Sequence, residues 1–202
     1  MRRKYILGIG LVLAGLAACA STEFTSTWKD PTAQPNELQG KRVAAFVMTP
    51  NETLRRSGED ALAAELTRRG LQALPGYRLV STDQLKDTAQ LRQRLTQQGI
   101  QAAVIMRVVD TRQEVNYVPG AGPYYGSFDG YWGYGWSAAY DPGYLTTDTV
   151  VSVETLVYSV PDGKLLWGGL SDTVDPDKMD KMFKEIVDKA TGEMKKQGLI
   201  AE

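Results

Sequence analysis

The chain has 202 residues, with 23 Lys and Arg against 24 Asp and Glu, and it contains no histidine. This length suits one domain with a sizeable core, and the near-zero net charge argues against a nucleic-acid partner. With no histidine and a single cysteine, Cys19, the chain lacks the commonest general base and the usual zinc ligands, so the composition predicts no enzyme, no metal and no other cofactor.

Residues 1–18 have the pattern of a bacterial export signal. The chain begins with the positive run MRRK, and an apolar stretch of fourteen residues, Tyr5 to Ala18, follows it. This stretch is shorter than the roughly 20 residues that a spanning helix needs. The pattern therefore predicts a signal peptide over 1–18.

The signal ends in Leu16-Ala17-Ala18-Cys19, which resembles the bacterial lipobox. The resemblance implies cleavage before Cys19, a diacylglycerol group on its sulfur, and a further acyl chain such as palmitate on its new amine. Two or three acyl chains hold a protein on a membrane firmly, because each buried methylene contributes about 0.8 kcal/mol. We therefore predict lipidation at Cys19, with the membrane as partner; an ordinary secretory leader with a chance cysteine is the alternative.

The residue after Cys19 is Ala20, and by similarity to enterobacterial sorting rules this implies transfer to the outer membrane. The expected location is thus the outer membrane, with the lipid-anchored chain facing the periplasm. Without the leader the chain keeps 20 basic residues (23 − 3) and 24 acidic ones, a net charge of −4. This balance gives no polybasic membrane patch.

Residues 19–40 are rich in Ser, Thr, Pro and Gln and show no sustained period, so we expect a lipidated N-terminus followed by a flexible tether. Phe24 and Trp28 stand out in this stretch. They either dock back onto the folded domain or touch a partner. Docking is the favoured interpretation, because an aromatic residue in a linker most often packs on its own domain.

Residues 41–200 are predicted to form a single α/β domain, which begins with a buried strand over 43–48. A helix is expected over Glu52–Arg69, with Gly70 as its C-terminal stop. The helix begins near Asn51, or at a capping box that starts with Ser57.

Two basic residues in this helix, Arg55 and Arg56, stand four positions before the acids Glu59 and Asp60. On a helix these residues are neighbours. The pattern indicates either intrahelical ion pairs or a site for an anion or a partner, and ion pairs are the favoured interpretation.

Further elements follow from apolar runs and turn signals. Asp87–Thr88 is expected to interrupt the second helix. Gly168–Gly169 is expected to weaken the strand over 164–173, or to mark a bulge or a close approach. Strands are predicted over 77–81, 101–117, 146–160 and 164–173, helices over 82–98 and from Asp175 onward, and a hairpin turn over 161–164.

The order of these elements is βαβαβββα. Its first half is typical of parallel crossovers and its second half of antiparallel hairpins. The sequence therefore predicts an α/β (α+β) fold: a single mixed sheet of about five strands with helices packed on it.

Residues 117–144 break every pattern, because they hold seven tyrosines, two tryptophans and seven glycines. Aromatic residues favour interfaces and the lipid head-group zone. The segment is predicted to be a long Gly/aromatic loop that associates with a partner or with other copies, lies on a membrane, or stacks on sugars; a solvated insertion is the alternative. The candidate interaction residues are Tyr124, Tyr125, Tyr131, Trp132, Tyr134 and Trp136.

Three stretches, Trp28–Pro31, Asn51–Asp60 and Met106–Asp110, resemble a group of uncharacterised bacterial lipoproteins. More distantly, the layout resembles the α/β domain shared by the TolB N-terminal region and the curli secretion lipoprotein. The resemblance implies a Gly/aromatic insertion at this place. It transfers no catalytic or binding residue.

These observations favour a membrane-anchored, periplasm-facing lipoprotein that acts as a non-enzymatic interaction or envelope-assembly protein. Its partner is an envelope protein or a second copy, bound through the aromatic loop. The alternative is a subunit of an oligomeric, curli-type export channel. A carboxylate-based hydrolase is the least favoured hypothesis, because the chain has no histidine and no second cysteine.

Overall fold

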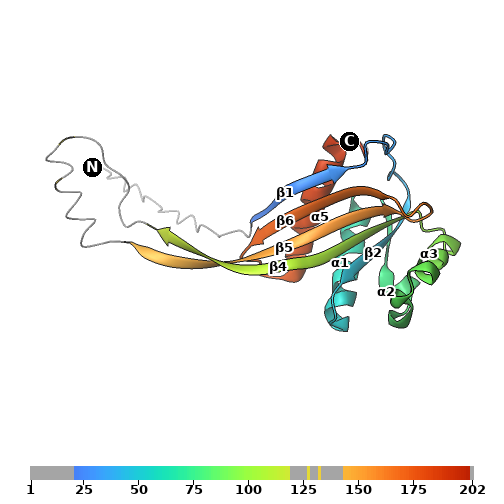
Figure 1. Ribbon diagram of the computed structural model, residues 1–202, viewed down its shortest axis with the longest axis horizontal. Coiled ribbons are helices and arrows are strands. Elements are labelled where there is room, and N and C mark those ends of the chain that lie inside the picture. The colour runs from blue at the N-terminus through green and yellow to red at the C-terminus, as the bar shows by residue number, and fades with distance from the viewer. Residues whose placement is uncertain (1–20, 119–126, 128–131, 133–142, 201–202) are drawn as a thin grey trace, which may run out of the picture.

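The structure of the protein is a computed structural model that describes residues 21–118, 127, 132 and 143–200. Its centre is a six-stranded mixed sheet in the order β1-β6-β5-β4-β2-β3, with helices on both faces (Figure 1). The strands are β1 (Ser21–Lys29), β2 (Arg42–Met48), β3 (Gln72–Pro75), β4 (Ala102–Val118), β5 (Tyr144–Ser159) and β6 (Leu165–Val174). The helices are α1 (Glu52–Arg68), α2 (Gly76–Leu79), η1 (Thr82–Lys86), α3 (Thr88–Gln97) and α5 (Met179–Lys196).

The sheet combines a parallel part and an antiparallel part. Strand β2 runs parallel to both of its neighbours, β3 and β4, and α1 and α3 make the crossovers. Strands β4, β5, β6 and β1 are antiparallel to one another. The predicted fold class, a single mixed sheet with packed helices, is confirmed; the sheet has six strands because β1 adds one.

Strand β1 corrects the prediction of a flexible tether. Residues 21–29 pair antiparallel with β6, from Ser21 opposite Val174 to Lys29 opposite Trp167. The Phe24 ring meets the Trp167 ring edge to face, with 5.6 Å between centroids. A Cβ on Gly169 would stand 2.5 Å from the Phe24 ring, so this glycine makes room for it. The predicted docking of Phe24 and the close approach at Gly169 are thus confirmed.

The turns after β1 also belong to the folded domain. Leu38 is buried, and its backbone N–H donates to the carbonyl of Leu199 at 3.2 Å. The Asn36 N–H donates to the Gly198 carbonyl at 2.9 Å. Trp28 differs from Phe24, because about half of its surface, 49%, remains exposed. A flexible tether is therefore wrong for 21–29 and for the turns that follow.

One ion pair holds the end of β1 against the β5–β6 turn. The Lys164 ammonium lies 2.6 Å from an Asp30 carboxylate oxygen, and the Thr32 N–H donates to the other oxygen at 2.8 Å. The hydrogen bond from Lys164, followed by that from Thr32, lowers the pKa of Asp30 from 3.8 to about 2. The charged form of Asp30 is therefore the one that the fold stabilises.

This pKa predicts an acid dependence of stability. A depressed carboxyl pKa contributes stability above the unfolded pKa, and that contribution is lost as the pH falls from about 4 to about 2. We expect Lys164→Gln to remove much of this loss, so that the denaturant midpoint falls less steeply across the window. Lys195→Gln removes the same charge from an exposed position on α5 and should keep the wild-type slope. Equal slopes for wild type and Lys164→Gln would contradict the assignment.

Helix α1 begins where Asn51 caps it, since the Asn51 side chain accepts from the backbone N–H groups of Thr53 and Leu54. The helix therefore includes Gly58 in its interior. A Cβ there would stand 2.9 Å from the Phe183 ring of α5, so the glycine lets the two helices approach. Helices α1 and α5 cover one face of the sheet, and α2 and α3 cover part of the other around Phe46.

Two predicted boundaries are wrong. The strand expected over 77–81 is a helical turn, α2, and the strand lies earlier, in β3. The first residue of this turn is Gly76. A glycine is needed there because a Cβ would stand 2.3 Å from the Phe46 ring. Helix α5 begins at Met179, not at Asp175. Asp175 has a φ of 45° and accepts the Thr149 N–H at 2.6 Å, so it joins the end of β6 to β5 instead.

Candidate functional site

Strands β4 and β5 continue past the rest of the sheet as a two-stranded projection (Figure 1). The last β6 residue, Val174, pairs with Val150, which pairs with Arg112. Beyond this row, residues 113–118 and 144–149 are the part of the described chain that remains paired, and we call these residues the arm. Six residues per strand at about 3.4 Å each give the arm a length of roughly 20 Å.

The arm is a regular continuation of the sheet. The β4–β5 register runs without a shift from Asp110 opposite Ser152 to Val118 opposite Tyr144. The Asn116 amide donates to the Asp148 carboxylate across the strands at 2.8 Å. Continuous pairing of this kind makes the arm an ordered part of the fold.

A hydrogen-bonded cluster fixes the base of the arm to the sheet. The Arg112 guanidinium donates to Asp172 at 2.8 Å, to Ser152 at 2.9 Å and to Glu114 at 2.9 Å. The Ser152 hydroxyl donates to Asp172 at 2.6 Å. The cluster therefore connects β4, β5 and β6. The hydrogen bond that Arg112 donates to Asp172 lowers the pKa of Asp172 and raises the pKa of Arg112, so both groups stay charged.

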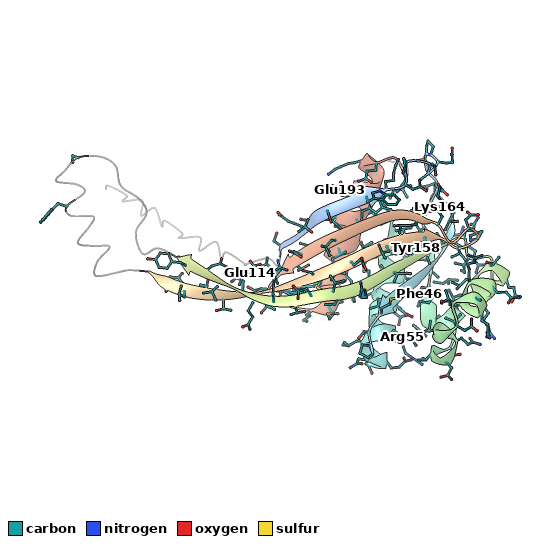
Figure 2. The ribbon with its side chains drawn as sticks, in the orientation of Figure 1. Phe46, Arg55, Glu114, Tyr158, Lys164 and Glu193 are labelled. Atoms are coloured by element: carbon teal, nitrogen blue, oxygen red, sulfur yellow. The ribbon has the colours of Figure 1, made fainter. Side chains whose placement is uncertain are left out.

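The arm has two chemically different faces. Side chains alternate along a strand, and residues paired across strands share a face. Val115, Tyr117 and Leu145 therefore share one face, and they are 64%, 61% and 69% exposed. The other face carries Glu114 and Asp148, together with Tyr144 (Figure 2 labels Glu114 on the projecting strands).

Charge also changes along the arm. Arg112, Glu114 and Asp148 stand at or near its base. From Val115 to Thr147 the sequence contains no charged residue other than Asp129 and Asp141. The described end of the arm is thus uncharged and carries the exposed side chains of Val115, Tyr117, Tyr144 and Leu145.

The predicted interaction residues are only partly placed. Tyr124, Tyr125, Tyr131, Tyr134 and Trp136 lie outside the described residues, as does the predicted lipidation site, Cys19. Trp132 is described and is 59% exposed.

The structure adds exposed residues that the sequence prediction did not select. Val115 and Leu145 are isolated apolar residues in polar stretches, so they give no strong signal in the sequence. Their common face becomes visible only when the register of β4 and β5 is known.

The start of β1 lies beside the base of the arm. Ser21 pairs with Val174, which is in the same row as Val150 and Arg112. Strand β1 then runs away from the arm, along β6. Cys19 is therefore two residues from the row where the arm begins.

The basic and acidic residues of α1 form a structural cluster. Arg55 donates to Glu52 at 2.9 Å and to Glu59 at 3.3 Å, which confirms the predicted intrahelical ion pairs at Arg55. Arg56 pairs with Glu52, not with Asp60. Hydrogen bonds from Arg55 and then Arg56 lower the pKa of Glu52 to about 2.

Glu59 is the buried member of this cluster, with 1% of its surface exposed. It accepts the backbone N–H of Tyr77 at 2.7 Å and that of Val47 at 3.5 Å. Burial raises the pKa of Glu59, although its hydrogen bonds and the charge of Arg55 act in the opposite direction. The carboxylate thus joins α1 to β2 and α2, which is a structural role.

A cavity of about 310 Å³ lies between β2, β4, α1 and α3. Its lining is mainly apolar, and the ionisable residues that line it are Arg55 and Glu59, which pair with each other. The cavity therefore presents no pair of acids, which a carboxylate-based hydrolase would need. Among the described residues no cluster of three or more acidic, cysteine or histidine side chains is placed to hold a metal ion.

The described residues thus define a mixed α/β domain with a projecting β-arm. Among them, no helix combines the length and apolar character that a membrane crossing needs. No protein-family model matches the sequence, and a search of curated proteins finds no match.

Solved structures with a similar chain fold include the PelC dodecamer from Paraburkholderia phytofirmans, at 13% identity and a TM-score of 0.48, covering 91% of this chain and 99% of that one. A variant of the same dodecamer has 14% identity and a TM-score of 0.45, covering 85% and 94%. Lipoprotein GNA1162 from Neisseria meningitidis has 13% identity and a TM-score of 0.42, covering 78% and 99%. Likenesses at this level assign neither a family nor a function to the chain.

Proposed function

We propose that this protein is a lipid-anchored, periplasm-facing component of the outer membrane that works by interaction and not by catalysis. In this proposal Cys19 carries the lipid, and the β4–β5 arm together with residues 119–142, which join its two strands in the sequence, presents the interacting surface. The observation that carries the proposal is the arm itself: an ordered ribbon, outside the core, with three large exposed apolar or aromatic side chains on one face.

Two physical properties suit the arm to binding. Exposed aromatic side chains bury a large area when they meet a partner. The Arg112 cluster and the continuous register hold the ribbon in place before any partner arrives. Preorganisation of this kind reduces the entropy lost on association. The partner is a second copy of the chain or another envelope protein.

A subunit of an oligomeric export channel is a second candidate, and the alternation of the arm favours it. The face with Val115, Tyr117 and Leu145 carries no charge, whereas the other face carries Glu114 and Asp148, and strands of a membrane barrel also alternate between a less polar and a more polar face. A spanning strand needs about 9–11 residues, and the described residues give the arm six in each strand. The described part of the arm is therefore too short to span, so the interaction surface is the first candidate.

The test of this proposal shortens the segment between the two strands. Replacing residues 119–142 by a single Asn creates the sequence Val118-Asn-Gly143-Tyr144. Gly143 already has a φ of 90°, so it suits the second position of a two-residue hairpin turn. We expect this variant to fold and to lose partner crosslinks formed in cells by a photoreactive residue at position 144.

A photoreactive residue at Gln93, on the exposed side of α3, is the matched control. Helix α3 lies at the end of the molecule opposite the arm (Figure 1). Crosslinks from position 93 equal to those from 144, or crosslinks that survive the replacement, would contradict the proposal. The size of the detergent-extracted protein separates the two candidates, since a large ring supports a channel and a monomer or dimer does not.

A further inference from the structure

The chain between the predicted anchor and the fold is very short. Ser21 is the first residue of β1, so one residue, Ala20, separates it from Cys19. Two extended residues reach at most about 7 Å. A lipid on Cys19 therefore holds the start of β1 close to the membrane surface.

Along the molecule, Ser21 is level with the base of the arm. Ser21 lies in the row of Val174, Val150 and Arg112, where the arm begins. The arm continues from this row for roughly 20 Å, while the sheet and helices extend in the other direction (Figure 1). The end of the arm thus projects beyond any position that Cys19 can reach.

The position of Ser21 limits how the sheet and helices, which we call the body, can be oriented on the membrane. Strand β1 is an edge strand. With the bilayer surface near Ser21, two orientations leave the polar body in water. In one, the long axis of the molecule stands upright on the membrane and the arm enters its surface. In the other, the β1 edge lies parallel to the membrane and the arm lies on its surface. The reverse orientation would push the helices and their charges into the bilayer. Both acceptable orientations bring the arm to lipid.

The side chains and the backbone of the arm together limit how deep it can lie in the membrane. Its uncharged end carries Val115, Tyr117, Tyr144 and Leu145, and tyrosine is favoured at the membrane–water interface. Glu114 and Asp148 stand closer to the base. Among the described residues neither outer edge of the arm pairs with a third strand, so its backbone cannot be buried in hydrocarbon. The depth that satisfies both requirements is the head-group layer.

We infer that the arm is a second membrane contact, whose end lies in the head-group layer of the bilayer that holds the lipid on Cys19. This inference rests on the anchoring at Cys19 that is proposed above, and it adds a lipid contact of the arm to the protein partner proposed there. The arm then fixes how the body is oriented on the membrane, which a single flexible anchor cannot do.

The experiment uses the full lipidated chain in phospholipid vesicles, isolated by flotation. Cys19 is the only cysteine, and its sulfur carries lipid in the mature chain, so a new cysteine can be labelled selectively. An environment-sensitive fluorophore is attached at Leu145→Cys and, as the matched control, at Gln93→Cys on α3. Spin-labelled lipids with the quencher in the head group or deep in the acyl chain report depth.

We expect blue-shifted emission from position 145, quenching by head-group labels, and protection from an aqueous quencher. Position 93 should remain fully accessible to that quencher. A floating protein whose position 145 behaves like position 93 overturns the arm contact alone. Strong quenching of position 145 by deep acyl labels overturns the head-group depth in favour of a spanning hairpin. Absence of acyl mass on Cys19 overturns both this inference and the proposed anchoring.

Discussion

Glu59→Ala is expected to lower the free energy of unfolding by about 3–5 kcal/mol, the range for breaking a buried ion pair. The side chains of Glu59 and Arg55 are 1% and 6% exposed, so neither reaches bulk water easily. Removing the carboxylate takes away one of the two acidic partners of the buried Arg55 and leaves Glu52 as the other. It also removes the acceptor of the Tyr77 N–H, which bonds Glu59 at 2.7 Å.

Equilibrium denaturation of the unlipidated chain, begun at Ala20, measures this loss. Two further variants make the result specific. Glu59→Gln keeps an acceptor for the Tyr77 N–H, so it should lose less than Glu59→Ala. Asp60→Ala removes an acid from the next position, where the side chain is 50% exposed, and should change stability by no more than about 1 kcal/mol.

Equal losses for Glu59→Ala and Asp60→Ala would show that burial of the carboxylate is unimportant. A Glu59→Gln variant as unstable as Glu59→Ala would assign the effect to charge rather than to the hydrogen bond with Tyr77. The three variants together therefore separate the two contributions of Glu59.

The sequence predicted the centre of the fold well, because the buried strands are strongly apolar. The run from Ala102 to Met106 and the Met182–Phe183 stripe of α5 have the periods of a buried strand and an amphipathic helix. The caps at Asn51 and Asp87 were also recognisable, since Asn and Asp accept the first N–H groups of a helix.

Strand β1 could not be predicted with the same rules. It is an edge strand rich in Ser and Thr, and most of its side chains are exposed, so it lacks an apolar period. Its stability comes from pairing with β6 and from the Phe24–Trp167 contact, both separated from it by more than a hundred residues. Such long-range contacts are invisible to a local reading of the chain.

The two misplaced boundaries have local causes that depend on tertiary contacts. Tyr77 suits a strand by propensity, but Glu59 of α1 accepts its N–H, and the residue before it is a glycine that leaves room for the Phe46 ring. Asp175 suits a helix cap, but it accepts the N–H of Thr149 from the neighbouring strand. In both places a partner from another element overrides the local preference.

The candidate site was predicted by composition and not by position. The density of Tyr, Trp and Gly pointed to residues 117–144 as an unusual segment. The contribution of Val115 and Leu145 depends on a pairing register that the sequence does not define. The closeness of Ser21 to the arm depends on the pairing of β1 with β6, which the sequence does not define.

Cys19→Ser is expected to release the protein from the membrane completely. Two long acyl chains bury on the order of 30 methylene groups at about 0.8 kcal/mol each, roughly 20 kcal/mol in all. The end of the arm offers four exposed side chains, each worth about 1.5–3 kcal/mol if fully buried, and head-group contact buries them only in part. The arm therefore orients the protein but cannot replace the lipid.

Fractionation of cells and intact-mass measurement check this expectation. Wild type should partition with membranes and carry acyl mass, whereas Cys19→Ser should lack acyl mass and leave the membrane fraction. Leu145→Asp places a charge at the end of the arm and keeps Cys19, so it should stay in the membrane fraction with normal acyl mass. A Cys19→Ser chain that stays in the membrane fraction with the wild-type acyl mass would contradict the anchor, and release of Leu145→Asp would show that the arm contributes far more than its exposed side chains can.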